Sequence, residues 1–132
     1  MSLRSALGRA QGHGSAHSGV HHWWMQRLTA LALVPLSVWF VFSLLALRHV
    51  RDGQSYDNVR AWVAQPASVL LLTLLVLIGA WHSRLGVQVV IEDYVTDRGS
   101  RTLALILSNF LHVLVAAAGV LAILRVSFGV SS

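Results

Sequence analysis

Three ionisable side chains, His82, Arg84 and His112, lie inside long apolar stretches of the sequence. A titratable or charged group inside a bilayer is costly, so each of these residues is a candidate for a functional role. The chain has no cysteine, which excludes disulfides and cysteine-ligated iron–sulfur clusters within it. A redox centre held by this chain would therefore depend on histidine, whose neutral imidazole is a common axial ligand of haem iron.

His82 and His112 are expected at similar depth on neighbouring helices. At 1.5 Å per residue, each lies about 14 Å from the same membrane surface, His82 before the end of its predicted span and His112 after the start of its own. The residues alone leave three interpretations open: His82 is a haem ligand, both histidines bind one haem, or each makes a hydrogen bond between helices. Arg84 follows His82 by two positions, and residues so spaced do not share a helix face. If His82 faces a cofactor, Arg84 is expected to point elsewhere.

Polar groups also gather where the apolar stretches end. Arg27 precedes the first stretch, where its guanidinium can either extend to the membrane surface or pair with a carboxylate such as a haem propionate. Glu92, Asp93 and Tyr94 follow the second stretch. Two acids and a phenol there can supply protons and a hydrogen bond to a ligand that enters from the lipid. The alternative is a solvated helix end, although acids at a helix C-terminus oppose the helix dipole.

Three long apolar segments must position these groups. The chain of 132 residues is 55% hydrophobic and 11% charged, whereas an ordinary soluble domain is about a quarter charged. The predicted spans cover residues 28–47, 66–91 and 103–124, and each is long enough to cross a hydrocarbon layer of about 30 Å. These observations predict an all-α integral membrane protein with three transmembrane helices, and they exclude a soluble enzyme.

The rest of the chain divides around these spans. We expect a polar segment at residues 1–27, a membrane domain at 28–125, in which residues 48–65 form a polar loop, and a short tail at 126–132. Pro35 predicts a kink in the first span, and Pro66 is suited to the first turn of the second. Three helices bury little against one another, so we expect a bundle completed by a partner membrane subunit.

The net charge of +5 comes from arginines scattered between the apolar runs. This placement is typical of a lipid–water interface, so we exclude nucleic acid as a partner and expect membrane lipid instead. The distribution of arginines between the two sides gives little information on orientation.

Residues 81–95 (WHSRLGVQVVIEDYV) resemble the signature of the small, hydrophobic membrane-anchor subunit of succinate dehydrogenase, respiratory complex II. In that family a histidine is followed by a glycine, a Gln-Val pair and then Asp-Tyr-Val, and all of these are present at matching spacing. The segment from Gly19 to His21, with Arg27 and Leu28-Thr29-Ala30 after it, resembles the entry to the family's first span. The three-span layout also matches, so the resemblance covers nearly the whole chain.

The resemblance implies a role for each matching residue. His82 would be one axial ligand of haem b, and the second ligand would come from a companion cytochrome b subunit. Arg27 and His21 would lie near the haem propionates. Tyr94 would donate a hydrogen bond to a ubiquinone carbonyl, with Asp93 beside it in the supply of protons. The resemblance implies no role for His112.

The resemblance also implies an assembly and a location. The chain would be a subunit of succinate:ubiquinone oxidoreductase that docks a flavoprotein subunit, which carries FAD, and an iron–sulfur subunit, which carries the clusters. Its N-terminus would be on the cytoplasmic side, and its bacterial-like start favours a bacterial inner membrane over a mitochondrial one. Two other functions stay open: a haem-free anchor like that of some fumarate reductases, and a small proton or ion pathway through His82, Arg84 and His112.

Overall fold

The computed structural model describes residues 15–48 and 55–129, and no strand occurs in these two ranges. The helices in them are α2 (Ser15–Arg48), α3 (Ser55–Val63), α4 (Pro66–Tyr94) and α5 (Arg98–Ser127). Three helices are long and apolar enough to cross a membrane: Gly19–Leu47 within α2, α4 and α5. The predicted all-α fold with three transmembrane helices is therefore confirmed.

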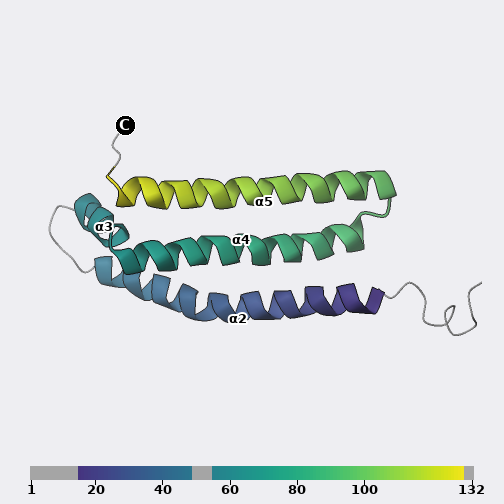
Figure 1. Ribbon diagram of the computed structural model, residues 1–132, viewed down its shortest axis with the longest axis horizontal. Coiled ribbons are helices and arrows are strands. Elements are labelled where there is room, and N and C mark those ends of the chain that lie inside the picture. The colour runs from purple at the N-terminus through teal and green to yellow at the C-terminus, as the bar shows by residue number, and fades with distance from the viewer. Residues whose placement is uncertain (1–14, 49–54, 130–132) are drawn as a thin grey trace, which may run out of the picture.

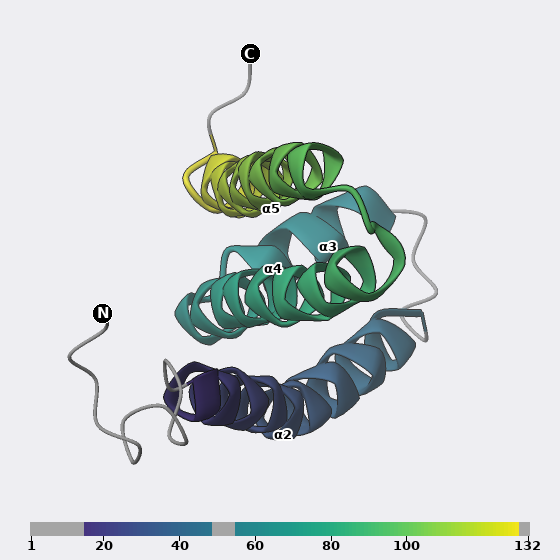
Figure 2. The ribbon, with the colours of Figure 1, turned by 90° about the vertical axis from the view of Figure 1, so that its right-hand side faces the viewer.

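The three long helices lie side by side and antiparallel, with α4 in the middle (Figures 1 and 2). Helix α4 packs against both α2 and α5, whereas α2 and α5 do not pack against each other within the described residues. Every residue of the described ranges that counts as buried, namely Ser68, Leu72 and Leu85, belongs to α4. The arrangement is an open layer, so most of its apolar surface is available to lipid or to a partner subunit.

The helices extend further than the predicted spans. Helix α2 begins at Ser15 and has 34 residues, so at 1.5 Å per residue it is about 51 Å long and continues well beyond a hydrocarbon layer of about 30 Å. It bends near its middle (Figure 1), and Pro35 lies inside it, where the ring removes one backbone hydrogen bond. Residues 1–14 of the expected polar segment and residues 130–132 of the expected tail lie outside the described residues.

Part of the expected polar loop at residues 48–65 is a helix instead. Helix α3 presents Trp62 to α2, where its ring stacks on that of Trp39 with 5.9 Å between centroids and lies 6.5 Å from that of Phe40. Burial of these large aromatic surfaces stabilises α3 although its composition is polar. The apolar positions of α3 are spaced as on one face of a helix, and this short periodicity could have indicated the element.

The two interfaces of α4 differ in how closely the backbones approach. On the α5 side, a Cβ added at Gly119 would lie 2.9 Å from Cγ1 of Val76. On the α2 side, a Cβ at Gly79 would lie at an ordinary contact distance of 3.9 Å from Cδ2 of Leu33. Only glycine fits at position 119, so α4 and α5 are held in close contact by a small residue, as membrane helices commonly are.

Candidate functional site

His82 lies in the second half of α4, is half-buried and faces α2. Its Nδ1 is 2.9 Å from the hydroxyl oxygen of Thr29 on α2. The same hydroxyl is 2.7 Å from the carbonyl oxygen of Met25 and 3.1 Å from that of Gln26, both in the preceding turn of α2. The imidazole is therefore held in a fixed orientation against the neighbouring helix.

His112 lies on α5, also half-buried, and faces the opposite side of α4. Its Nδ1 is 2.7 Å from the carbonyl oxygen of Ser108, and its Nε2 is 3.2 Å from the hydroxyl oxygen of Ser83 on α4. Both ring nitrogens are thus used inside the chain, in the interhelical hydrogen bond that was one of the interpretations of this residue. His82 and His112 have different neighbours, and the structure does not bring them together around a shared site.

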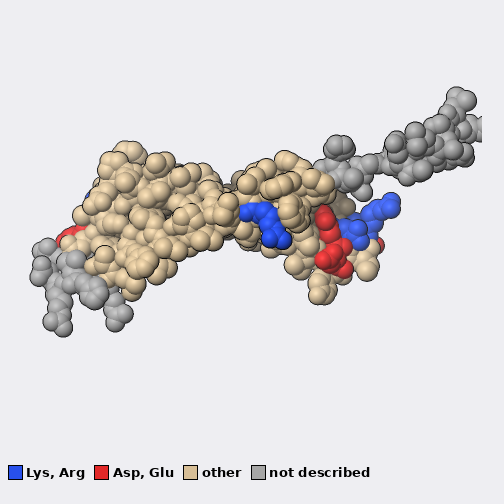
Figure 3. Space-filling view, turned by 90° about the horizontal axis from the view of Figure 1, so that it is seen from below, with Lys and Arg blue, Asp and Glu red and all other residues tan. Residues whose placement is uncertain are grey.

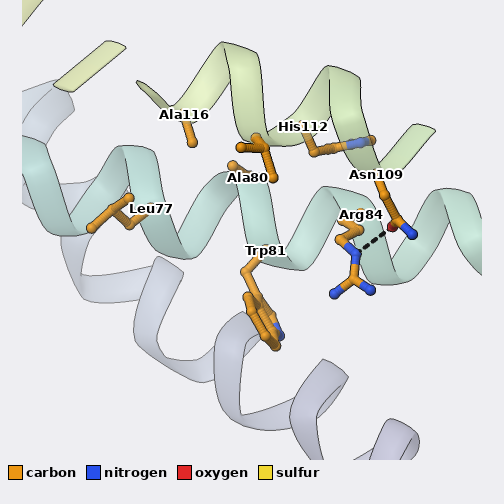
Figure 4. Close-up of a pocket in the computed structure, with 8 residues that line it drawn as sticks. Leu77, Ala80, Trp81, Arg84, Asn109, His112 and Ala116 are labelled. Carbon is orange, nitrogen blue, oxygen red and sulfur yellow. Dashed lines mark hydrogen bonds between the residues drawn. The ribbon is translucent and has the colours of Figure 1, made fainter. Parts of the chain in front are cut away.

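Arg84 contacts α5 through its Nε, and its side chain also lines the polar groove between α2 and α4. Its Nε donates a hydrogen bond of 2.6 Å to Oδ1 of Asn109 (Figure 4), and its guanidinium lies over the ring of Trp81, 5.4 Å from the ring centroid. An open, mostly apolar groove of about 550 Å³ lies between α4 and α5, and its lining includes Trp81, Arg84, Asn109 and His112. The different directions of His82 and Arg84 agree with their spacing of two residues on one helix.

His21 lies at the other interface, between α2 and α4. Together with His22, Gln88 and Glu92 it lines a groove of about 500 Å³ that is markedly more polar than the groove between α4 and α5. Nε2 of His22, which lines this groove, and Oε1 of Gln26, one turn further along α2, are buried and have no hydrogen-bond partner among the described residues. A ligand with hydrogen-bonding groups could satisfy such atoms, because unpaired buried polar groups are costly.

Arg27, expected near the same ligand as His21, is exposed on α2. Its guanidinium lies 5.1 Å from the ring centroid of Trp23, one turn earlier in the helix. This contact is a cation–π interaction, which keeps the side chain close to the helix surface. Arg27 does not line the polar groove with His21.

Asp93 and Tyr94 form the end of α4, and both are exposed. The Tyr94 side chain is 83% exposed, so its hydroxyl is accessible to a ligand or a partner subunit. Glu92 beside them accepts a hydrogen bond of 2.8 Å from Nε2 of Gln88, one turn earlier. The pair Asp93 and Tyr94 therefore remains accessible, whereas Glu92 is oriented along the helix.

A three-residue link, Val95 to Asp97, connects α4 to α5 and fixes the position of Tyr94. The Asp97 carboxylate caps α5 by accepting a hydrogen bond of 2.8 Å from the backbone N–H of Ser100. Nε of Arg101 donates a hydrogen bond of 2.9 Å to the carbonyl oxygen of Val95. The backbone N–H and then the hydroxyl of Ser100 hold the pKa of Asp97 below its ordinary value of 3.8.

Charged side chains lie near both ends of the long helices, and Asp57, Arg60 and Arg125 belong to the end that holds α3. On the face drawn in Figure 3, the basic and acidic side chains lie mainly towards the end where α2 and α5 begin and α4 ends, and most of the remaining surface is uncharged. The polar groove with His21, and Asp93 and Tyr94 at the end of α4, belong to this end. In the part of the chain that the structure describes, no group of three or more His, Cys, Asp or Glu residues could hold a metal ion.

Several residues of this region were not singled out by the sequence. Thr29, Ser83 and Asn109 are polar residues within apolar runs. They form hydrogen bonds with His82, His112 and Arg84, respectively. Their signal in the sequence is weak, because serine, threonine and asparagine are tolerated in membrane helices when they find a partner on a neighbouring helix.

Comparison with known proteins gives a consistent result. The family model described as "Succinate dehydrogenase/Fumarate reductase transmembrane subunit" matches residues 1–121. A succinate dehydrogenase hydrophobic membrane anchor subunit of Rickettsia bellii is 34% identical over 122 residues, which cover 92% of this chain and 94% of the relative. The protein of the same description from Paracoccus denitrificans is 33% identical over 120 residues, which cover 91% of this chain and 89% of the relative.

A succinate dehydrogenase membrane anchor subunit of Reclinomonas americana is 32% identical over 95 residues, which cover 68% of this chain and 74% of the relative. No solved structure matches the chain. The family match spans most of the sequence, including all of the residues that surround His82 and the end of α4. On these grounds the chain belongs to the family of succinate dehydrogenase and fumarate reductase transmembrane subunits.

Proposed function

We propose that this membrane anchor subunit of succinate dehydrogenase supplies His82 as one axial ligand of haem b, and Tyr94 and Asp93 to a ubiquinone site. The observation that carries the proposal is the state of His82, which is half-buried in a membrane helix and uses only Nδ1 in a hydrogen bond among the described residues. An ionisable residue at such a position is costly unless it has a function. The three apolar helices and the bacterial relatives make this a multi-pass protein of a bacterial inner membrane.

The donor set fits a haem that is shared between two subunits. One imidazole from this chain can provide one axial bond, and a companion cytochrome b subunit would provide the other. His21, in the polar groove between α2 and α4, and Arg27, exposed on the same helix, would bind the propionates. A guanidinium is well shaped to pair with a carboxylate. Haem b, when bound, would supply a one-electron redox centre within the membrane.

The end of α4 would bind the ubiquinone head group. The phenol of Tyr94 is exposed and would donate a hydrogen bond to a quinone carbonyl, which favours the negative charge that develops there as electrons arrive. Asp93 is the adjacent exposed acid and would pass protons from water to the reduced oxygen atoms. Reduction to ubiquinol takes two electrons and two protons, and this chain would contribute to orientation and proton supply.

The soluble subunits would dock at the same end of the molecule. The charged groups seen in Figure 3 gather there, where a water-soluble partner can form polar contacts. A flavoprotein subunit with FAD and an iron–sulfur subunit would carry succinate oxidation and electron transfer, and the N-terminus of this chain would lie on that cytoplasmic side. This chain has no cysteine, so clusters with thiolate ligands must be held by other subunits. It acts as a non-catalytic subunit of an oxidoreductase complex.

The test is to purify the complex from native membranes in mild detergent through a tag on this chain. We expect flavoprotein and iron–sulfur subunits in the preparation, succinate-dependent reduction of ubiquinone, and a visible spectrum of haem b. An active complex without the haem spectrum would instead support the haem-free anchor. A preparation with neither soluble subunits nor activity would contradict the proposal and favour a proton or ion pathway, which has less structural support because His82 and His112 face opposite sides of α4.

A further inference from the structure

We propose that Thr29 is a positioning residue that fixes the tautomer of His82, with Nδ1–H donating to the threonine hydroxyl oxygen and the lone pair of Nε2 left for the iron. This inference rests on the proposed function, in which His82 is an axial ligand of haem b. It assigns a role to a side chain on α2, a helix that does not contain the ligand itself. The contact that carries it is the distance of 2.9 Å between Nδ1 of His82 and Oγ1 of Thr29.

The direction of this hydrogen bond follows from the other contacts of the hydroxyl. Oγ1 of Thr29 is 2.7 Å from the carbonyl oxygen of Met25 and 3.1 Å from that of Gln26. A carbonyl oxygen can only accept, and two oxygen atoms at 2.7 Å repel each other unless a hydrogen lies between them. The single hydroxyl hydrogen of Thr29 therefore points to the carbonyl of Met25. Oγ1 must then accept from His82, so the proton of the neutral ring is on Nδ1.

His112, the other histidine within a membrane helix, has partners at both ring nitrogens. Nδ1 of His112 is 2.7 Å from the carbonyl oxygen of Ser108 and donates to it, and Nε2 accepts from the Ser83 hydroxyl. His112 therefore has the same tautomer, but its Nε2 lone pair is already used. His82 differs because its Nε2 has no partner among the described residues. Thr29 thus prepares one of the two histidines for an axial bond.

The hydrogen bond would also adjust the electronic properties of the ligand. An acceptor on Nδ1–H fixes the orientation of the ring and raises the basicity of the opposite nitrogen. A more basic axial ligand stabilises ferric over ferrous iron, so the contact lowers the midpoint potential of the haem. Thr29 is half-buried, and its hydroxyl is held by the turn of α2 before it, so the acceptor is fixed in place before the haem binds.

The experiment measures the haem rather than the activity of the enzyme. Thr29→Val keeps the shape of the side chain and removes the hydroxyl. In the purified complex we expect the haem midpoint potential to shift to a higher value, with altered g-values in the electron paramagnetic resonance spectrum of the ferric state. Thr29→Ser keeps an acceptor and should restore both to nearly their wild-type values. Thr73→Val, the same change at a threonine on α4 that makes no hydrogen bond to His82, should leave both unchanged.

A second substitution at the same position provides a test if the complex with Thr29→Val assembles poorly. Thr29→Cys offers a thiol, which is a weak acceptor of similar size, and predicts a smaller shift in the same direction. A wild-type midpoint potential and spectrum in Thr29→Val or in Thr29→Cys would overturn the proposal. A shift in Thr29→Ser equal to that in Thr29→Val would also overturn it. A wild-type complex without haem, or a His82→Ala complex with an unchanged haem spectrum, would instead show that the proposed function has failed, and the role of Thr29 with it.

Discussion

His82 on α4 contacts α2, and His112 on α5 contacts α4 at the neighbouring residue, Ser83. The two imidazoles differ in how many of their ring nitrogens form hydrogen bonds within the chain. His112 has hydrogen bonds at both nitrogens, to Ser108 and Ser83, and so connects α5 to α4. His82 has one, to Thr29, and so leaves a nitrogen for something outside the described residues. Residue type and depth are alike for both, so the partners of a histidine inside a membrane helix decide its role.

The two interfaces of α4 show the same difference on a larger scale. The α5 side has close backbone contact at Gly119 and a network of side-chain hydrogen bonds through Ser83, Arg84 and Asn109. The α2 side has the looser contact at Gly79 and the polar groove that includes His21. The α5 interface uses its polar side chains mainly within the chain, and the groove at the α2 interface is the more polar of the two.

The largest expected effect comes from exchanging the two histidines for alanine one at a time. His82→Ala should abolish or strongly perturb the haem b spectrum of the purified complex, because an axial ligand is lost. His112→Ala should keep the spectrum and only weaken the packing of α5 on α4, since it removes hydrogen bonds inside the chain. The measurement is the reduced-minus-oxidised visible spectrum per assembled complex. Equal loss of the spectrum in both variants would show that His82 and His112 do not differ in their relation to the haem.

Tyr94→Phe tests whether the accessible end of α4 serves the quinone. The hydroxyl is lost while the exposed ring remains, so we expect ubiquinone reduction to fall by about tenfold, the effect of roughly 1.4 kcal/mol from one hydrogen bond in the transition state. Succinate oxidation with a soluble artificial dye should be unchanged, because it does not need the quinone site. The ratio of the two rates is the measurement, and a parallel fall in both would indicate misassembly.

Gly119→Ala tests the close contact between α4 and α5. The added methyl would lie 2.9 Å from Cγ1 of Val76, a β-branched residue with little rotamer freedom, so we expect a loss of about 1–3 kcal/mol of stability from overpacking. Gly79→Ala is the matched control at the α2 interface, where the nearest atom is 3.9 Å away, and it should be nearly neutral. The apparent thermal midpoint of the purified complex reports both. A larger loss in Gly79→Ala would contradict the assignment of α4–α5 as the tight interface.

The sequence was sufficient for the architecture but less so for the site. Long apolar runs at residues 28–47, 66–91 and 103–124 predict three membrane helices directly, because a bilayer requires that length and polarity. Helix α3 was expected to be part of a polar loop, since its polar composition concealed the apolar side on which Trp62 packs against Trp39. A stabilising contact between distant residues is not visible in local composition.

The resemblance selected His82, Asp93 and Tyr94, but the sequence alone could not separate His82 from His112. The separation depends on Thr29 and Ser83, and their roles follow from which helix face each occupies and which helices are neighbours. Helical periodicity shows that residues 82 and 83 point in different directions. It does not show that α4 lies between α2 and α5, which decides the partner of each residue.

The smallest expected effect concerns the link that closes α4 onto α5. The backbone N–H of Ser100, followed by its hydroxyl, lowers the pKa of Asp97 from 3.8, so the folded state favours the charged carboxylate. This contribution to stability is complete above the unfolded pKa and is lost as the pH falls through the lower folded pKa. Asp97→Asn keeps a capping oxygen without the charge. The difference in apparent thermal midpoint between wild type and variant should be constant above about pH 5 and shrink below about pH 4. A difference that stays constant or grows on acidification would show that the charge of Asp97 does not stabilise this turn.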